Sequence, residues 1–265
     1  MINYRIIALD VDGTLINDLH EVTPRVRNAV REAADRGAEI VLCTGRGSTS
    51  ALPVLTELDL QGTMITHNGA SIVDSLTKTA IGETGIPPGP ASRYLRFARE
   101  RGIHYDMNTA FDLYVHGKVE DEIEAMYERM HAKPIVRSGE EPLPEGLVKI
   151  SLFASKEALD EAEAAWSGWK HELQTVRSGD FFIDVQHPLA SKGEALRRLA
   201  EMRGVPREQV LAIGNYYNDI GMLEFAGLGV AMANSPEDVK AVADALTASN
   251  NEDGVALALE RHVLA

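Results

Sequence analysis

The chain has 265 residues, of which 45% are hydrophobic and 25% charged, and this composition is typical of a soluble globular protein with room for one large domain or two. Its formal net charge of −14 argues against nucleic acid and anionic membranes as partners, because both carry dense negative charge. No apolar stretch approaches about 18 residues, and MINYRIIALD lacks a basic region followed by a long apolar one, so we expect no transmembrane segment and a cytoplasmic location.

The first third of the chain alternates apolar strands with amphipathic helices. The run YRIIALD (4–10) predicts a buried strand. Thr23 then caps a helix that has Pro24 at its first position and ends at Gly37. The single cysteine, Cys43, lies in the apolar stretch EIVLCT, where it is expected to be a small buried side chain, and it excludes an internal disulfide. The other elements predicted here are strands at 38–44 and 62–66 and a helix at 48–58.

Between about residues 83 and 188 the pattern changes to half-buried strands mixed with helices. The Pro/Gly-rich stretch ETGIPPGP marks the change. Two of the strands, at 103–107 and 111–116, are expected to be antiparallel. The other elements predicted here are helices at 91–101, 119–131 and 156–166, a loop at 138–146, and strands at 147–154 and 180–186.

From Ser191 the first pattern returns, and Ser191 and Glu194 form the S-x-x-E pattern of a capping box at a helix start. The elements predicted after it are a helix at 191–204, a strand at 209–215, a helix at 219–227, a strand at 228–234 and a terminal helix. Apolar strands punctuated by helices predict a parallel sheet with helices on both faces. The predicted fold is therefore α/β: a discontinuous Rossmann-like core, residues 1–82 and 189–265, with an inserted α+β domain, residues 83–188.

The first predicted strand ends with two aspartates, Asp10 and Asp12, in the sequence DVDG. Side chains two positions apart in an extended segment point the same way, so their negative charges should repel. A solvated turn, in which Gly13 supplies a positive φ, explains the pattern without any function. A cation that neutralises the pair, with one carboxylate doing chemistry, explains it equally well. The other residues near the end of this strand decide between the solvated turn and the cation site.

Two further polar clusters stand beside predicted strands and helices. In CTGR, Thr44 offers a hydroxyl, Gly45 lets the backbone approach an anion, and Arg46 brings a fixed cation. A helix cap with a solvated arginine is the alternative for this cluster. Lys192 lies in the first turn of a predicted helix, where a cation opposes the helix dipole unless an anion is held there.

A fourth cluster, Asn215, Asn218 and Asp219 in IGNYYNDIGM, follows another apolar strand, although such residues also start helices. The carboxyl ends of parallel strands meet at one edge of a sheet, so we expect all four clusters to meet there. Carboxylates, a Thr-Gly notch and a lysine together match phosphoryl transfer. Mg²⁺ suits the carboxylate and carbonyl oxygens, whereas no HxH or HExxH spacing supports zinc and no GxxxxGK[ST] supports a P-loop.

DVDGTL, TGR, Lys192 and GNYYND stand in the order of the four motifs of the haloacid dehalogenase (HAD) superfamily, which this chain resembles over its whole length. The insertion between the second and third motifs resembles the C2B cap of the Cof-type phosphatases. THNGASIVD (66–74) is similar to the hairpin that precedes that cap. The resemblance implies a Mg²⁺-dependent phosphatase that acts on small phosphorylated metabolites, such as sugar phosphates, through an aspartyl-phosphate.

The resemblance also implies a role for each matching residue. Asp10 would be the nucleophile and would bind Mg²⁺ through its other oxygen. Asp12 would protonate the leaving alcohol and then activate water, with its backbone carbonyl on the metal. The residues implied to hold the phosphate are Thr44, Gly45, Lys192 and Asn218. Asp219 would stay near the metal, directly or through water.

One position departs from the family pattern. The fourth motif usually reads GDxxND, and Asn215 stands where its first aspartate would be. An amide oxygen still ligates Mg²⁺ but brings no charge, so we expect weaker metal binding, for which Asp219 compensates in part.

Two other hypotheses stay open. A phosphomutase of the same fold needs cationic residues in the insertion to hold a second phosphate, and the candidates Arg137, Lys149 and Arg177 are few. A weakly active or non-catalytic sugar-phosphate binder is supported only by Asn215, and the intact pair of motif aspartates argues against it. We expect a monomer or a homodimer. The polar residues expected to face the leaving group are Arg46, His67, Asn68 and His187.

Overall fold

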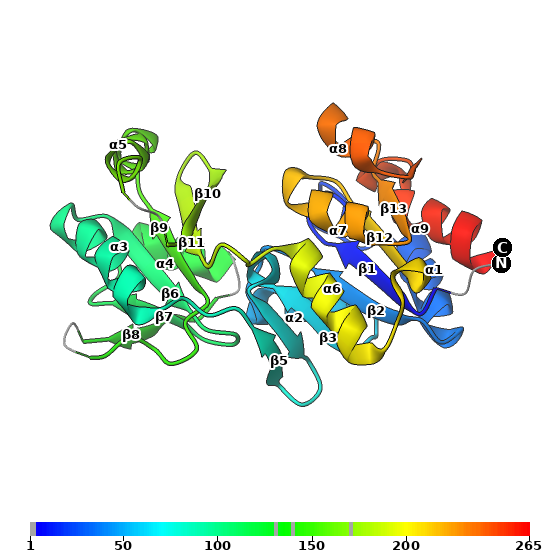
Figure 1. Ribbon diagram of the computed structural model, residues 1–265, viewed down its shortest axis with the longest axis horizontal. Helices are drawn as coiled ribbons and strands as arrows, with labels where there is room; N and C mark the ends of the chain where they lie inside the picture. Colours follow the sequence, from blue (N-terminus) through cyan, green and yellow to red (C-terminus); the bar gives the residue numbers. More distant parts are fainter. Residues whose placement is uncertain (1–3, 130–131, 139–140, 170–171) are drawn as a thin grey trace. The chain divides into compact units, whose positions relative to one another are not determined.

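The residues that the computed structural model describes are 4–129, 132–138, 141–169 and 172–265. The chain divides into two compact units, coloured along the sequence in Figure 1. Unit 1 combines Met1–Gly82 with Ser191–Ala265, and unit 2 is Glu83–Ala190. The division after Ala190 lies two residues beyond the end of the insertion expected from the sequence.

Unit 1 is built on an eight-stranded sheet with the strand order β14-β13-β12-β1-β2-β3-β4-β5. Neighbouring strands from β14 to β3 are parallel, and β4 runs antiparallel to β3. The strands are β1 (Ile6–Asp10), β2 (Glu39–Cys43), β3 (Thr63–Thr66), β4 (Ser71–Asp74), β5 (Thr79–Glu83), β12 (Val210–Gly214), β13 (Leu228–Ala231) and β14 (Ala245–Leu246). The helices are α1 (Pro24–Asp35), α2 (Ser48–Glu57), α6 (Lys192–Arg203), α7 (Ile220–Phe225), α8 (Glu237–Val242) and α9 (Gly254–Leu259). The predicted α/β class with a parallel sheet is confirmed.

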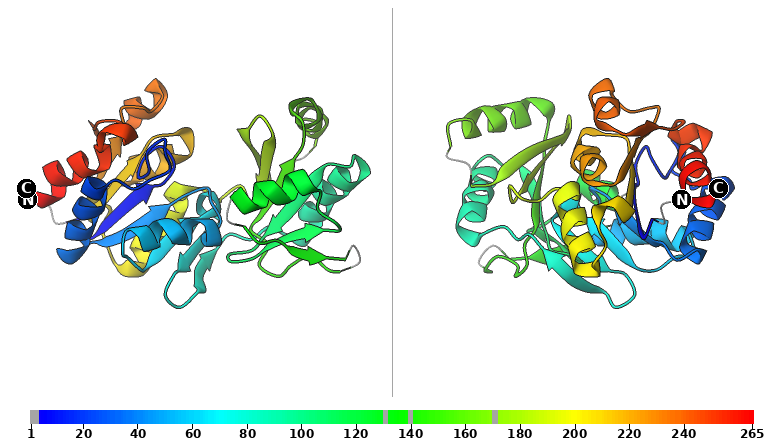
Figure 2. Two further views of the ribbon diagram at one scale, coloured as in Figure 1. Left: turned by 180° about the vertical axis from the view of Figure 1, so that it is seen from behind. Right: turned by 45° about the vertical axis from the view of Figure 1, so that its right-hand side comes forward.

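The core of unit 1 explains how the end of β1 meets the start of α6. Ile6 and Ala8 pack in one buried cluster with Leu196 of α6 and Leu223 of α7. Since alternate residues of a strand share a face, Asp10 belongs to the face of the sheet that these helices cover. Figure 2 shows α1 and α9 at the other face of the same sheet.

The predicted helix starts are present. Thr23 caps α1 by accepting a hydrogen bond from the Val26 N–H, and Pro24 is its first residue. Ser191 caps α6 by accepting from the Glu194 N–H, but the Glu194 carboxylate bonds to Arg197 instead of completing the reciprocal half of a capping box.

Unit 2 is an α+β unit around a six-stranded sheet with the order β10-β11-β9-β6-β7-β8. Its strand pairs are antiparallel except β7 and β8. Its elements are α3 (Pro88–Glu100), β6 (His104–Asn108), β7 (Leu113–His116), α4 (Asp121–Arg129), β8 (Ile135–Arg137), β9 (Lys149–Phe153), α5 (Lys156–Trp166), β10 (Gln174–Gly179) and β11 (Phe182–Gln186). Residues of α3 and α5 form the larger apolar cluster with one face of this sheet, and residues of α4 form a second cluster with Val115 and Phe153.

Four strands were not expected from the sequence: β5, β8, β10 and β14. They are short or polar, and β8 exposes Val136, so they carry little of the apolar alternation that marks a strand. The single terminal helix expected after 234 is replaced by α8 and α9 with β14 between them. Residues 130–131 of the predicted helix at 119–131, and 139–140 of the predicted loop, lie outside the described residues. No helix in the described part of the chain is both long enough and apolar enough to cross a membrane.

Candidate active site

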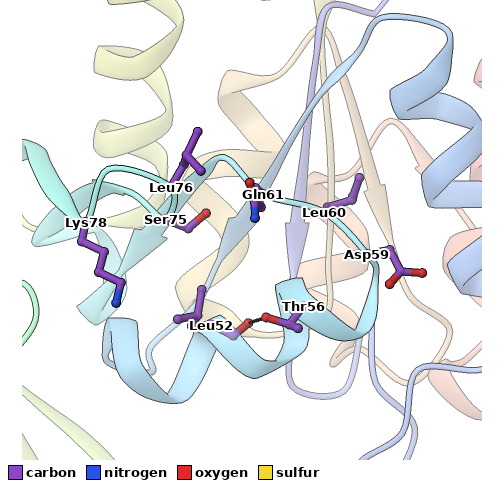
Figure 3. A pocket seen from close by; sticks show the side chains of 8 residues that line it. All are labelled: Leu52, Thr56, Asp59, Leu60, Gln61, Ser75, Leu76 and Lys78. Carbon is purple, nitrogen blue, oxygen red and sulfur yellow. Dashed lines mark hydrogen bonds between the residues drawn. The ribbon is translucent and has the colours of Figure 1, made fainter.

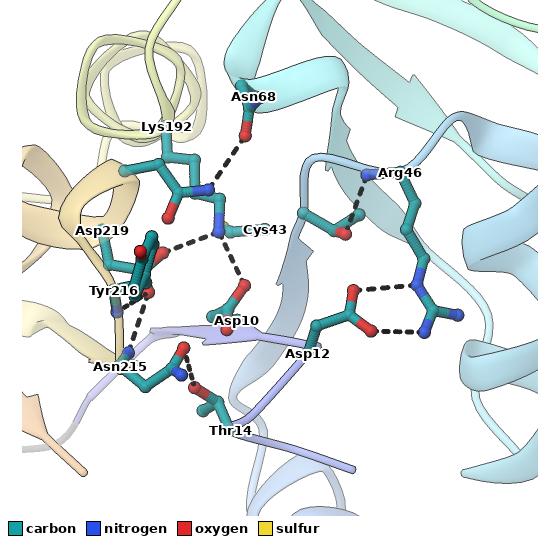
Figure 4. A network of polar contacts seen from close by, with 12 residues as sticks. Asp10, Asp12, Thr14, Cys43, Arg46, Asn68, Lys192, Asn215, Tyr216 and Asp219 are labelled. Carbon is teal, nitrogen blue, oxygen red and sulfur yellow. Dashed lines mark hydrogen bonds and ion pairs between the residues drawn. The ribbon is translucent and has the colours of Figure 1, made fainter. Parts of the chain in front are cut away.

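Lys192 is the centre of a buried charged cluster at the carboxyl edge of the parallel sheet (Figure 4). Its Nζ donates to Asp10 Oδ1 and to Asp219 Oδ1, each at 2.6 Å. The three side chains are 1%, 7% and 0% exposed respectively, in the order Lys192, Asp10, Asp219. A lysine in the first turn of a helix is unfavourable unless an anion lies beside it, and here two carboxylates take that place.

Burial and charge act in opposite directions on this cluster. Burial and the neighbouring Asp219 raise the pKa of Asp10 to about 7, although Lys192 acts to lower it. Burial alone would lower the pKa of Lys192, but its two carboxylate partners outweigh burial and raise it. Lys192 therefore stays charged and fixes one oxygen of Asp10 in place.

Asp219 also holds the loop that follows β12. Its Oδ2 accepts hydrogen bonds from the backbone N–H groups of Asn215, at 2.8 Å, and Tyr216, at 2.9 Å. Both carboxylate oxygens of Asp219 are therefore engaged, one by the loop and one by Lys192. Its expected place near a metal stays a prediction.

Asp12 does not share the environment of Asp10. Its carboxylate is 52% exposed and is held by Arg46 through a bidentate ion pair, with Nε to Oδ2 at 2.9 Å and Nη2 to Oδ1 at 2.5 Å. The strand ends at Asp10 and the chain turns through Gly13 at a φ of 75°, so the pleat that would point both carboxylates the same way stops before Asp12. Asp10 contacts Lys192 and Asp12 contacts Arg46, so the two carboxylates of the motif do not face each other without a cation.

The Thr44–Gly45–Arg46 segment forms a tight loop after β2. Thr44 is fully buried, and its Oγ1 accepts from the Arg46 N–H at 3.0 Å. A Cβ atom at Gly45 would lie 3.0 Å from Asn68 Oδ1, so a larger residue here would press on the Asn68 amide and require it to shift slightly. The loop leaves the Arg46 guanidinium directed at Asp12 (Figure 4).

The turn after β3 supports that loop. His67 and Asn68 have φ values of 51° and 55°, the left-handed region that side chains other than those of glycine rarely adopt. The backbone N–H of His67 bonds to Arg46 O and that of Asn68 to Thr44 O. Asn68 Oδ1 accepts from Asn218 Nδ2 at 3.0 Å. The turn thus joins the second motif to the fourth, while the expectation that His67 and Asn68 face a leaving group stays a prediction.

His187, the fourth residue expected to face the leaving group, belongs to unit 2. It follows β11, and its Nδ1 accepts from the Leu189 N–H at 3.1 Å.

Asn215 lies beside Asp10 and provides the test of whether these residues suit a cation. The inward atom of its amide lies 3.0 Å from Asp10 Oδ2, 3.1 Å from the Asp12 carbonyl oxygen and 3.2 Å from Thr14 Oγ1. In octahedral Mg²⁺ with bonds of about 2.1 Å, adjacent oxygen ligands stand about 3.0 Å apart. With the amide oxygen inward, the spacing from Asn215 to each aspartate oxygen therefore suits neighbouring ligands on one Mg²⁺.

This donor set is a carboxylate, an amide and a backbone carbonyl. Among the described residues, no group of three or more His, Cys, Asp or Glu side chains could hold a metal ion. The sequence singled out these positions but not Thr14 as a partner of Asn215, because the two residues are 201 positions apart.

Two other features do not take part. Cys43 is fully buried, and burial raises the pKa of its thiol, so the prediction of a packing role is confirmed. Figure 3 shows a surface hollow of unit 1 beside the end of α2. Two of its polar groups are engaged locally: Thr56 Oγ1 donates to Leu52 O, and Ser75 Oγ accepts from the Gly62 N–H.

An α/β fold that gathers buried charged side chains at the carboxyl edge of its parallel sheet is the architecture of enzymes that bind ligands at that edge. Residues 7–259 match the haloacid dehalogenase-like hydrolases, and the chain belongs to this family. It is 32% identical to the phosphatase YwpJ of Bacillus subtilis (strain 168) over 95% of this chain and 97% of that protein. The chain is a phosphatase of this family.

Solved structures agree. A haloacid dehalogenase-like hydrolase from Bacteroides thetaiotaomicron is similar with a TM-score of 0.87, at 28% identity over 98% of this chain and 99% of that one. The subclass IIB sugar phosphatase BT4131 has a TM-score of 0.80, at 26% identity over 97% of this chain and 98% of that one.

Proposed function

We propose that the protein is a Mg²⁺-dependent phosphatase that hydrolyses small phosphorylated metabolites, with sugar phosphates as the leading class, through a phosphoaspartate on Asp10. The observation that carries the proposal is the buried bridge from Lys192 to Asp10, which holds one carboxylate oxygen and leaves the other beside Asn215. The sugar-phosphate class rests on the likeness to a subclass IIB sugar phosphatase.

The cation would be held by Asp10, the backbone carbonyl of Asp12, Asn215 and, directly or through water, Asp219. When bound, it would supply positive charge against the phosphate oxygens as negative charge builds up there.

The chain's own carboxylates account for the bonds made and broken. Asp10 attacks phosphorus as the bond from phosphorus to the leaving oxygen breaks, and Asp12 gives its proton to that oxygen. Asp12 then takes a proton from water, which attacks the phosphoaspartate, releases inorganic phosphate and restores Asp10. To reach the leaving oxygen, Asp12 exchanges its contact with Arg46 for one with substrate. The residues proposed to hold the phosphate are Thr44, Gly45, Lys192 and Asn218.

Hydrolysis is favoured over transfer to a second phosphosugar by the cations of unit 2. Arg137 pairs with Glu141 at 2.8 Å, Lys149 lies 3.5 Å from Asp184, and Arg177 pairs with Glu163 at 3.0 Å. A phosphomutase would need such cations for a second phosphate.

The test is a screen of phosphorylated metabolites, with Mg²⁺ or with EDTA, for the parent and Asp10→Asn. We expect phosphate release from the parent only with Mg²⁺ and none from Asp10→Asn, because uncatalysed phosphate monoesters are extremely inert. The variant should fold, since the amide keeps the shape of the carboxylate. Near-parental turnover by a folded Asp10→Asn enzyme would rule out the covalent step.

A further inference from the structure

The Asn215 amide can sit in its place in two ways, which differ by half a turn about its last side-chain bond. With Oδ1 inward, the oxygen faces two acceptors, Asp10 Oδ2 and the Asp12 carbonyl, and its hydrogen-bond donor is the Thr14 hydroxyl. In this orientation the outward Nδ2 faces only donors. Oxygens about 3 Å apart repel one another unless a proton or a cation lies between them.

With Nδ2 inward, the two contacts between acceptors become hydrogen bonds. The nitrogen then donates to Asp10 Oδ2 at 3.0 Å and to the Asp12 carbonyl at 3.1 Å, with Thr14 Oγ1 at 3.2 Å. An amide nitrogen has two hydrogens, so it can serve both of the oxygens that the proposed function assigns to Mg²⁺. Each orientation of the amide therefore suits one state of the site.

The charges of the cluster favour the orientation in which the Asn215 nitrogen faces inward. Among the described residues Asp10 and Asp219 share one cation, Lys192, while Asp12 pairs with Arg46, so two buried carboxylates face one buried ammonium group. A neutral amide whose positive end faces Asp10 reduces that imbalance, whereas an aspartate at the same position would add to it.

Gly13 leaves room for either orientation. A side chain on Gly13, at a φ of 75°, would lie 2.4 Å from the outward atom of the amide. The amide is thus packed against backbone on one side and against the motif oxygens on the other.

We propose that Asn215 is a two-position group: in the metal-free enzyme its Nδ2 bridges Asp10 Oδ2 and the Asp12 carbonyl in place of the cation, and metal binding turns its Oδ1 inward as a ligand. The second position rests on the Mg²⁺ dependence in the proposed function, whereas the first does not. Asparagine instead of the family's aspartate at position 215 then lowers the affinity for the metal and stabilises the metal-free site.

The first experiment measures unit 1 without metal. Thermal unfolding in EDTA is followed by labelling of the thiol of Cys43, which is buried in β2. The parent should melt above Asn215→Ala, which loses the hydrogen bonds, and Asn215→Ala above Asn215→Asp, which also adds a charge. We expect steps of roughly 2–4 °C per kcal/mol lost. Asn28→Asp, at an exposed position of α1, controls for the added charge and should melt with the parent.

An Asn215→Asp protein that melts with the parent or above it in EDTA overturns the bridge. In excess MgCl₂ the order of the parent and Asn215→Asp should reverse or close, because the aspartate then meets a cation. A parent whose melting does not respond to MgCl₂ overturns the second position and the Mg²⁺ dependence together, while the comparison in EDTA still decides the bridge.

The second experiment observes the amide itself. The side-chain ¹⁵N resonance of Asn215 is assigned by its loss in the spectrum of Asn215→Asp. In EDTA its protons should exchange slowly with solvent, since both are hydrogen-bonded, and MgCl₂ should remove that protection while the amide of Asn28 stays unchanged. Fast exchange of the Asn215 amide in EDTA contradicts the proposal even if every variant is too unstable to melt cleanly.

Discussion

At the scale of single residues, the site depends on one ammonium group that serves two carboxylates. Lys192 is only 1% exposed and lies 2.6 Å from an oxygen of Asp10 and of Asp219. Because neither carboxylate has another cation within reach among the described residues, Lys192 is the condition for burying the pair.

Replacing this lysine should therefore destabilise unit 1 strongly. Lys192→Met leaves two buried carboxylates without a cation, and we expect the free energy of unfolding to fall by about 3–5 kcal/mol in urea titrations. Lys240→Met is the control, because Lys240 pairs with the exposed Glu237 and should cost less than about 1 kcal/mol. Equal losses in the two variants would contradict the central role of Lys192.

Asp12 offers a residue-level test of acid catalysis. Proton donation matters most for a poor leaving group, so Asp12→Asn should slow phosphoaspartate formation more with a sugar phosphate than with a nitrophenyl phosphate. Single-turnover trapping of the phosphoenzyme measures both rates. Arg46→Gln removes the same ion pair but keeps the acid, so it should not discriminate between the substrates in this way. Equal slowing of both substrates in Asp12→Asn would remove Asp12 from that step.

At the scale of elements, the turn between β3 and β4 fixes the geometry of the loops around it. Its residues His67 and Asn68 are held in the left-handed region by hydrogen bonds to the backbone of the Thr44–Arg46 segment. The Asn68 amide then reaches Asn218 in the fourth motif. This short turn can in this way set the relative position of two segments that are proposed to hold the phosphate.

Substitutions of Asn68 separate backbone strain from the side-chain contact. Asn68→Gly suits the positive φ but deletes the amide, so we expect near-parental stability with several-fold weaker inhibition by inorganic phosphate. Asn68→Ala loses the same amide and also strains the backbone, so it should be less stable by about 1 kcal/mol. In an Asn218→Ala background, Asn68→Gly should weaken phosphate binding no further. Additive effects on phosphate binding would mean that Asn68 does not act through Asn218.

Local signals explain which elements and site residues could be predicted. Thr23, Pro24 and Ser191 act on the next turn of chain, so their helices start where expected. The ends of apolar strands likewise marked Asp10 and Asp219. The pairing of Asp12 with Arg46 was not predictable, because it depends on where the strand stops and on a loop 34 positions away. The strand β8, three residues long, owes its existence to β7 beside it and not to its own pattern.

At the scale of the whole molecule, the two units carry separate spectroscopic labels. Both tryptophans, Trp166 and Trp169, lie in unit 2, and the single cysteine, Cys43, lies in unit 1. Trp166 is 1% exposed and packs edge-on against Tyr94, so its fluorescence reports the core of unit 2. Unfolding of each unit can be followed in the intact chain.

These labels allow a test of pH dependence in unit 2. Burial raises the pKa of Asp106 to about 6, although Lys149 and the Asn108 amide act to lower it. The folded state thus binds the proton more tightly than the unfolded state, so this group's stabilisation is present below about pH 4 and is lost as the pH rises through about 6.

Asp106→Asn should remove the loss of unit 2 stability that occurs as the pH rises through about 6. Relative to the parent, we expect the variant to gain on the order of 3 kcal/mol between pH 4 and pH 7.5, measured by tryptophan fluorescence. Labelling of Cys43 should show no such change in unit 1. Asp112→Asn, in an exposed turn, is the matched control. A difference between Asp106→Asn and the parent that is constant with pH would show that Asp106 titrates normally.

The central position of β1 has a consequence for how the chain is made. This strand, which is completely buried, pairs with β2 on one side and with β12 on the other. When the chain leaves the ribosome, β2 follows within about thirty residues, but β12 comes some two hundred residues later. Until then one edge of this apolar strand is unpaired and can pair with strands of other chains.

Unit 2 is synthesised in that interval. A folded unit 2 holds Gly82 and Ser191 closer together than an unfolded chain of the same length would. The loop that must close when β12 pairs with β1 is then effectively shorter. Early folding of the insertion would then protect the nascent enzyme from aggregation.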